Sequence, residues 1–298
     1  MNFKDKRIEF RPAPIARDPY IQSLIEKRLI NLVPDRPDEK EFIGIYSEEE
    51  INNDLAEVNR LEGIFNTSET KNEYAKNISS IYEIVLTDQI ESNAWFGENC
   101  ETFPASKYDD IKNGIDSVCV FKGEEDSQYL GLGMDVTFTS DSKDLINKLD
   151  SIKNCIRSGE LPSIKYFKNP HTGDKKKIFL PKVIVGSRFA SAEKLIRLWA
   201  DKSPDRNKKL QSHPVSSKLI LEIIVQLRYF SNFALRQSEH ANDDEKSNSY
   251  YKIALAYAQM NNIFFDIYQE KKKTIDLNMN ELSDDIVYET ILKYADRG

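Results

Sequence analysis

Two aspartates, Asp116 and Asp135, belong to apolar stretches that have the composition of β-strands. The stretches 114–121 and 129–140, joined by the polar turn 123–128, predict an antiparallel hairpin. Burying an unpaired carboxylate costs several kcal/mol, so two carboxylates delivered by neighbouring strands require a cation. A hard divalent ion with oxygen ligands, Mg²⁺ or Mn²⁺, meets that need.

The alternation of side chains along a strand determines which residues accompany each aspartate. Asp116 shares a face with Val118 and Val120, and Asp135 shares a face with Thr137. The hydroxyl of Thr137 can hydrogen-bond a water molecule, although it carries no charge. The two strands therefore deliver two carboxylates and one hydroxyl.

A helix predicted over residues 78–95 offers a third carboxylate. Its apolar residues fall nearly all round the helix, which indicates a buried central position. Glu83 shares a flank with Ile90 and is expected to face protein, which makes it the first choice as a metal ligand. Glu91 lies on a different flank and is the second choice.

A lysine on a second helix is the candidate cationic group. The stretch 140–156 is amphipathic with a period of about 3.6 residues, and Leu145 and Ile152 lie on its apolar stripe. Lys148 lies at the margin of that stripe, whereas Lys143 points away from it. A lysine at such a margin also commonly extends its ammonium group into water, which is the alternative interpretation.

The order of these elements and the motif they carry resemble the PD-(D/E)XK nuclease superfamily over residues 75–190. That family has an αβββαβ core. An Asp that follows a glycine and an aliphatic residue, as in Gly114-Ile115-Asp116, and the acid of the (D/E)-x-K triplet hold Mg²⁺ in the family. Here the triplet reads Asp135-Val136-Thr137, so threonine replaces the lysine.

The resemblance implies roles for the other candidates. An acid on the first core helix, here Glu83, often joins the metal ligands of the family, and some members carry the motif lysine on the following helix, where Lys148 stands. The implied activity is metal-dependent hydrolysis of nucleic-acid phosphodiester bonds, with DNA as the expected substrate. Asp116 and Asp135 would hold Mg²⁺ or Mn²⁺, while Lys148 would orient or help deprotonate the attacking water.

Two alternatives remain open from the sequence. The first is a catalytically inactive member of this fold that has lost its lysine and binds nucleic acid or a protein partner. The second is a helical interaction protein whose acids are surface or strand-end residues. Residues with good turn composition precede Asp116 and are interpreted as turn residues: Asp109, Asp110 and Asn113.

Composition excludes several other classes of site. The 3 cysteines include no C-x-x-C pair, the 3 histidines stand far apart, and no phosphate-binding glycine motif occurs. No stretch has the roughly 20 apolar residues of a membrane span or the apolar core of a signal peptide, so we expect a cytoplasmic protein without a membrane partner. The segment 161–215 holds 13 Lys or Arg against 4 acids in a chain of net charge -7. Such segregation favours a polyanionic partner, although a solvated lysine-rich face is an equal alternative.

The predicted architecture is α/β (α+β). Residues 1–70 are predicted as an N-terminal helical extension in which Ser47 and Glu50 form a capping box, and residues 71–200 as the restriction-endonuclease-like core. Further strands are predicted at 164–167 and 176–186, and residues 201–298 as a C-terminal helical region.

Overall fold

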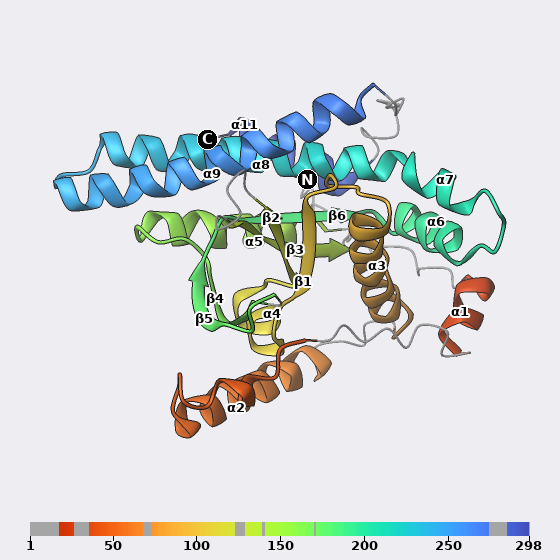
Figure 1. Cartoon of the computed structure of the whole chain (residues 1–298), viewed down its shortest axis with the longest axis horizontal. Helices are drawn as coiled ribbons and strands as arrows, with labels where there is room; N and C mark the ends of the chain where they lie inside the picture. The colour runs from red at the N-terminus through yellow and green to blue at the C-terminus, as the bar shows by residue number, and fades with distance from the viewer. Residues whose placement is uncertain are drawn as a thin grey trace, which may run out of the picture.

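The computed structural model describes residues 18–26, 36–67, 73–122, 129–138, 141–169, 171–273 and 285–297. In this part of the chain a four-stranded mixed sheet lies at the centre (Figure 1), with the strand order β1-β2-β3-β6. Its strands are β1 (Cys100–Pro104), β2 (Ser117–Lys122), β3 (Tyr129–Phe138) and β6 (Lys182–Ser187). A separate hairpin consists of β4 (Ser163–Lys168) and β5 (Lys175–Phe179).

Helices surround the sheet. They are α1 (Pro19–Glu26), the 3-10 helix η1 (Glu39–Phe42), α2 (Glu48–Thr67), α3 (Glu73–Ser92), α4 (Lys107–Asn113), α5 (Ser142–Arg157), α6 (Phe189–Ala200), α7 (Arg206–Gln211), α8 (Pro214–Glu239), α9 (Asp244–Lys271) and α11 (Ile286–Asp296). The described helices include none that is both long and apolar enough to cross a membrane.

The predicted hairpin is confirmed. β2 and β3 pair antiparallel, with Ser117 opposite Met134 and Lys122 opposite Tyr129. The turn predicted at 123–128 lies outside the described residues. After β3 the chain passes through α5 and returns as β6, which pairs parallel with β3. The helix predicted over 140–156 is α5, and its expected apolar stripe is buried.

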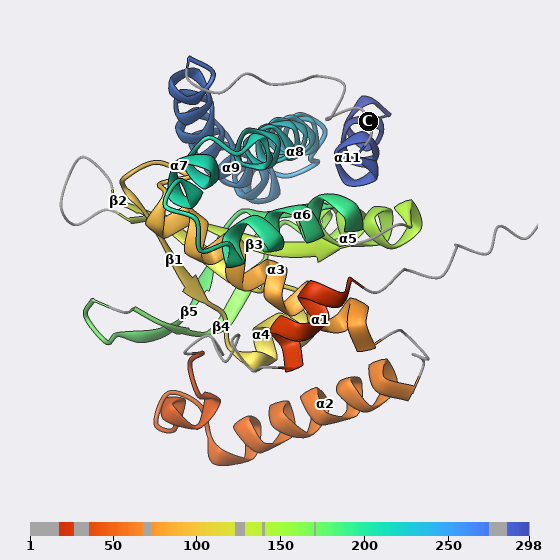
Figure 2. The same ribbon diagram turned by 90° about the vertical axis from the view of Figure 1, so that its right-hand side faces the viewer.

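The two faces of the sheet are covered differently. Alternate residues of β3, such as Leu132 and Met134, belong to the large apolar cluster that α3, α5, α6, α8 and α9 share. On the opposite face, Val118 packs with Ile164 and Leu180 in a small cluster. Figure 2 shows β4 and β5 on this second side of the sheet, away from α8 and α9. One face is therefore covered by helices, and the other by the β4–β5 hairpin together with Ala105 and Ile115, which flank α4.

Side chains of α8 and α9 cap the free edge of β6. Gln226 accepts the N–H of Ile184 at 2.9 Å and donates to its carbonyl at 2.6 Å. Glu222 accepts the N–H of Gly186 at 3.1 Å, and Tyr257 lies 3.4 Å from the N of Lys182. An unpaired strand edge leaves buried backbone groups unsatisfied and invites pairing with other chains, so these side chains stand in for a fifth strand.

A lysine of β4 connects the β4–β5 hairpin to α2. Lys165 Nζ of β4 lies 2.5 Å from Asp54 and 2.6 Å from Glu50, both on α2. The rings of Tyr46, Tyr108 and Tyr166 surround the same ammonium group at 4.8 to 5.6 Å. One of the two hydrogen bonds of the predicted capping box of α2 is present: Glu50 donates its N–H to Ser47 Oγ at 3.1 Å.

Two sequence predictions of local structure are wrong. Residues 107–113 form the helix α4 and not a turn, because Ser106 caps its N-terminus and Gly114 ends it at φ 61°. Asp109, interpreted as a turn residue, is fully buried and accepts the N–H groups of Lys165 and Tyr166. The strand predicted over 176–186 is two strands, β5 and β6, in different sheets. In addition, β1 was not predicted.

The basic segment 161–215 does not form one free cationic face. Several of its cations pair with acids from other parts of the chain: Lys165 with Asp54, Lys168 and Lys175 with Glu41, Lys182 with Asp135, and Arg197 with Asp18. Within the described residues, Lys176 and Lys177 are exposed. Only part of the positive charge in this segment is therefore available to a partner.

Candidate metal centre

Asp116 and Asp135 occupy opposite positions of the β2–β3 hairpin. Asp116 directly precedes β2, whose first residue, Ser117, is paired with Met134. The N–H of Asp116 donates to the Met134 carbonyl at 2.9 Å, and Asp116 Oδ2 accepts the N–H of Val136 at 2.6 Å. These hydrogen bonds hold the Asp116 carboxylate against the backbone on either side of Asp135.

Asp135 is buried and contacts two lysines. Lys148 Nζ from α5 lies 2.5 Å from Oδ1, and Lys182 Nζ from β6 lies 3.3 Å from Oδ2. Lys182 Nζ also donates to the Asn113 carbonyl at 3.0 Å. The Lys148 side chain is 39% exposed and that of Lys182 is 7% exposed, so water reaches only the first.

Lys182 was not predicted from the sequence. The sequence did contain a signal for it, because a lysine begins the apolar run 182–186. A charged residue in a buried strand is expected to have a partner of opposite charge. Gly114, the residue that ends α4, explains how closely Lys182 and Asp135 approach the backbone here. A Cβ at this position would lie 2.9 Å from Lys182 Nζ and 3.3 Å from Asp135 Oδ2. A side chain at this position would have to displace the Lys182 ammonium group.

Asp110 and Arg36 also belong to the site, although the sequence interpretation assigned Asp110 to a turn. The Asp110 side chain hydrogen-bonds the Asp116 carboxyl group. Arg36 Nη1 lies 2.5 Å from Asp110 Oδ2.

Glu83 faces the same group of side chains from α3. Burial raises its pKa to about 7, with Asp110 and Asp135 acting in the same direction and Arg36 and Lys148 opposing them. Glu91, the second choice, lies elsewhere, since its carboxylate accepts the N–H of Thr102 in β1 at 3.3 Å. The structure therefore brings Glu83, and not Glu91, into the electrostatic range of the two aspartates.

Thr137 lies two residues beyond Asp135 on β3 and is buried beside β6, opposite Gly186. A Cβ on Gly186 would lie 2.1 Å from the Thr137 carbonyl oxygen and 2.8 Å from its Cγ2. The two strands are therefore closely packed at Thr137. Its side chain is neutral, so it supplies no ammonium group. The ammonium group that contacts Asp135 from α5 belongs to Lys148.

The electrostatics of the site reflect an excess of acid. Burial, followed by Glu83, Asp135 and Asp110, raises the pKa of Asp116 well above its ordinary value. Burial lowers the pKa of Lys148, but the neighbouring carboxylates, chiefly Asp135, outweigh it and leave that pKa raised. Lys148 is therefore an ammonium ion at neutral pH.

We call the four acids the carboxylate cluster: Glu83, Asp110, Asp116 and Asp135. Their cationic neighbours are Arg36, Lys148 and Lys182. Four carboxyl groups against three cations leave a site that favours either extra protons or one more cation, which agrees with the raised pKa values of Glu83 and Asp116.

No protein-family model, curated protein or solved structure matches this chain. The assignment of the site therefore depends on its own chemistry.

The donor set suits a hard divalent cation held by few protein ligands. Among the described residues, no three His, Cys, Asp or Glu side chains are grouped as a ready metal site. Mg²⁺ commonly binds through one or two carboxylates and completes its shell with water and substrate phosphates. Asp116 and Asp135 are the pair that could hold such an ion, in place of the backbone N–H and the ammonium groups that they contact here.

Proposed function

We propose that this protein is a divalent-metal-dependent nuclease of the PD-(D/E)XK type that hydrolyses phosphodiester bonds in DNA. The observation that carries the proposal is the contact of Lys148 with Asp135, beside the position that Asp116 occupies on the neighbouring strand. This contact supplies from α5 the charge that Thr137 lacks in the motif.

The order of elements supports the same proposal. The helix α3 is followed by β1, β2 and β3, then by α5 and β6, with β6 parallel to β3. The order agrees with the αβββαβ order that the resemblance implies if α4 and the β4–β5 hairpin are taken as insertions. In that alignment β1 is the strand that was not predicted from the sequence.

The residues have distinct parts in the proposed reaction. Asp116 and Asp135 would hold Mg²⁺ or Mn²⁺, with Glu83 as a further ligand or as a base for a bound water molecule. The bound ion would polarise the scissile phosphate and lower the pKa of a water molecule. Because Lys148 is protonated, it would donate to a phosphate oxygen and neutralise charge that develops there, and would not abstract a proton.

A second candidate is an inactive binding module with the same fold. It is favoured by one observation, that both oxygens of Asp135 already contact ammonium groups. In such a protein Lys148 and Lys182 would neutralise Asp135, and the lysine that the reaction needs at position 137 would be missing. Substituting Thr137→Lys would then be expected to create cleavage where the natural protein has none.

Cleavage assays separate the two candidates. Purified protein is incubated with supercoiled plasmid, linear duplex, single-stranded DNA and RNA in Mg²⁺, Mn²⁺ or EDTA. We expect cleavage that EDTA abolishes and that Asp116→Asn, Asp135→Asn or Lys148→Met reduces at least about 100-fold. The matched control is Asp150→Asn, an exposed aspartate of α5 whose partner is Tyr294. Absence of metal-dependent cleavage on every substrate would contradict the nuclease.

A further inference from the structure

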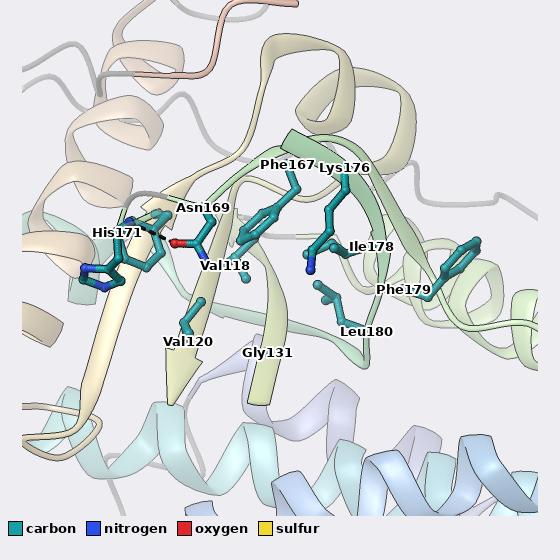
Figure 3. Close-up of a pocket in the computed structure, with 11 residues that line it drawn as sticks. Val118, Val120, Gly131, Phe167, Asn169, His171, Lys176, Ile178, Phe179 and Leu180 are labelled. Carbon is teal, nitrogen blue, oxygen red and sulfur yellow. Dashed lines mark hydrogen bonds between the residues drawn. The ribbon is translucent and has the colours of Figure 1, made fainter. Parts of the chain in front are cut away.

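A pocket of about 300 Å³ lies between the sheet and the β4–β5 hairpin, on the face that the helices leave open. Figure 3 shows its lining, with Val118, Val120 and Gly131 on the strands of the sheet and Phe167, Lys176 and Ile178 on the hairpin. It is distinct from the carboxylate cluster, because none of the four acids lines it.

The floor of the pocket is flat because β3 carries a glycine there. Gly131 lies opposite Val120 on β2 and leaves the backbone of the sheet uncovered. A Cβ at Gly131 would meet Leu180 at 3.7 Å and Val118 at 3.8 Å, which are ordinary contact distances. The protein could therefore accept alanine at this position, and the glycine serves to keep the pocket open.

The walls combine aromatic and hydrogen-bonding groups. Phe103 and Phe167 line the pocket and are half-buried. Asn169 Oδ1 accepts the N–H groups of His171 and Thr172, which turns the amide nitrogen away from that turn and toward Val118 (Figure 3). A planar aromatic ligand with acceptor atoms on its edge suits such walls.

Positive charge surrounds the mouth of the pocket. Lys176 lines it, and the exposed Lys177 follows on β5. Neither lysine forms an ion pair with another described residue, whereas Lys168 and Lys175 on the same hairpin both pair with Glu41. Lys177 Nζ lies 4.8 Å from the ring centre of the exposed Phe179. Figure 3 shows the Lys176 ammonium group reaching from the hairpin into the pocket, so it could meet an anionic group at the mouth, and Lys177 could contact an anionic backbone beside it.

A second hollow lies between the pocket and Arg36. This hollow of about 310 Å³ shares Phe103, Val118 and Phe167 with the pocket and reaches Arg36, the partner of Asp110. Val120 is four residues beyond Asp116 along one strand, a separation of about 13 Å. A polymer bound at the cluster could therefore place a neighbouring unit in the pocket.

We propose that this pocket holds one unpaired base of a single-stranded nucleic acid, stacked on Phe167 and Phe103, while Lys176 and Lys177 contact the adjoining phosphates. The proposal depends on the proposed function, since it defines the form of substrate that the cluster would cleave. A base stacked and paired in a duplex cannot enter a pocket between a sheet and a hairpin without leaving its stack. The uncompensated lysines disfavour a neutral apolar ligand.

The test measures binding without cleavage. The full-length protein in EDTA is titrated into two fluorescently labelled single-stranded oligodeoxynucleotides, one of thymidines and one with abasic residues at its centre. Stacking is worth about 1–3 kcal/mol per base, so we expect the wild-type protein to bind the thymidine strand about tenfold more tightly. A fully paired duplex of the same length is expected to bind more weakly than the thymidine strand.

Three variants assign that preference to the pocket. Phe167→Ala is expected to abolish the discrimination between the two strands. Gly131→Ala is expected to reduce it without lowering the melting temperature, because the added methyl group fits the fold but occupies the pocket. Lys176→Gln is expected to weaken the binding of both strands and to reduce the magnitude of the slope of log K against log salt concentration by about 0.7. The control is Tyr251→Ala, an aromatic residue of α9 that is 54% exposed.

The outcomes separate the pocket from the nuclease. Equal binding of the two strands by the wild-type protein, an unchanged preference in both folded pocket variants, or the same loss in Tyr251→Ala would overturn the pocket proposal. If the pocket variants lose discrimination but no metal supports cleavage, the pocket proposal stands and the nuclease proposal fails. If Mn²⁺ supports cleavage but the wild-type protein does not discriminate between the two strands, the pocket proposal fails and the nuclease proposal stands.

Discussion

Lys148 Nζ of α5 lies 2.5 Å from Asp135 Oδ1 of β3, and the lysine side chain is 39% exposed. Lys182, by contrast, lies 3.3 Å from the other oxygen of the same carboxylate with a side chain that is 7% exposed. The two lysines therefore balance one buried charge from different environments. This difference predicts that they contribute unequally to stability and to activity.

Replacement of the two lysines separates these contributions. Lys182→Met is expected to lower the free energy of unfolding by about 3 kcal/mol, because it removes a buried partner of Asp135. Lys148→Met is expected to lower it by about 1 kcal/mol or less, since the lysine side chain is partly exposed. The same substitution is expected to reduce cleavage by at least about 100-fold. Urea denaturation provides the measurement. Equal losses of stability in the two variants would contradict this assignment.

Gly114 is expected to be needed by the site and not only by the turn. Gly114 and Gly159 both have positive φ, at 61° and 82°, so Ala at either position should cost about 1 kcal/mol of stability. A Cβ at Gly159 meets nothing within 4 Å, whereas one at Gly114 meets Lys182 and Asp135. Only Gly114→Ala should therefore also weaken Mn²⁺ binding, measured by calorimetry. An equal effect of Gly159→Ala would show that the loss is not local.

The cap on the edge of β6 predicts a large cost for Gln226→Leu. The substitution leaves the buried N–H and C=O of Ile184 without partners, and such loss costs about 1–3 kcal/mol for each group. Gln259→Leu on the exposed side of α9 is the matched control and is expected to change stability by less than about 0.5 kcal/mol. Chemical denaturation compares them. A cost for Gln226→Leu no greater than that of the control would exclude the capping role.

Glu222 makes stability depend on pH. Its carboxyl group is buried, and burial raises its pKa from 4.5 to about 7, with Lys218 opposing. The folded state therefore holds this proton more tightly than the unfolded state, so this group stabilises the fold below pH about 4.5 and loses that contribution as pH rises through about 7. Glu83 and Asp116 act in the same direction.

The substitution Glu222→Gln should remove the part of this dependence that belongs to Glu222. Relative to the wild-type protein, the variant is expected to gain stability between pH 5 and pH 8, by up to about 3 kcal/mol. Thermal unfolding at both pH values measures the change, and Glu289→Gln on α11, an exposed position, serves as the control. A wild-type protein that becomes more stable across this range relative to the variant would contradict the sign.

Much of the fold was predictable because its pattern is local. The amphipathic period of α5 and the strand composition around Asp116 and Asp135 identified a helix and a hairpin that the structure contains. In contrast, β1 contains Glu101 and Pro104, and its partner residues are contributed by β2, so the local sequence carries little strand signal. The division between β5 and β6 occurs at Leu180-Pro181, and only tertiary pairing determines that they join different sheets.

Part of the candidate site could also be predicted from local sequence patterns, and part depends on tertiary packing. Asp116 and Asp135 could be paired from strand alternation, and Lys148 from its place on a helical stripe. Lys182 and Arg36 could not, because their contacts depend on how β6 and the segment before η1 pack against the hairpin. Asp110 was misinterpreted since turn composition and a short capped helix contain the same residues, and only the cap at Ser106 distinguishes them.

A crystal structure of the protein soaked in Mn²⁺ tests the central claim most directly. The account predicts an anomalous scattering peak bound by one carboxylate oxygen of Asp116 and one of Asp135, with Lys148 moved off Asp135. The same peak should be absent from crystals of the Asp116→Asn variant. A wild-type structure in saturating Mn²⁺ that has no peak between these carboxylates, and in which Lys148 still contacts Asp135, would contradict the metal centre and the nuclease proposed from it.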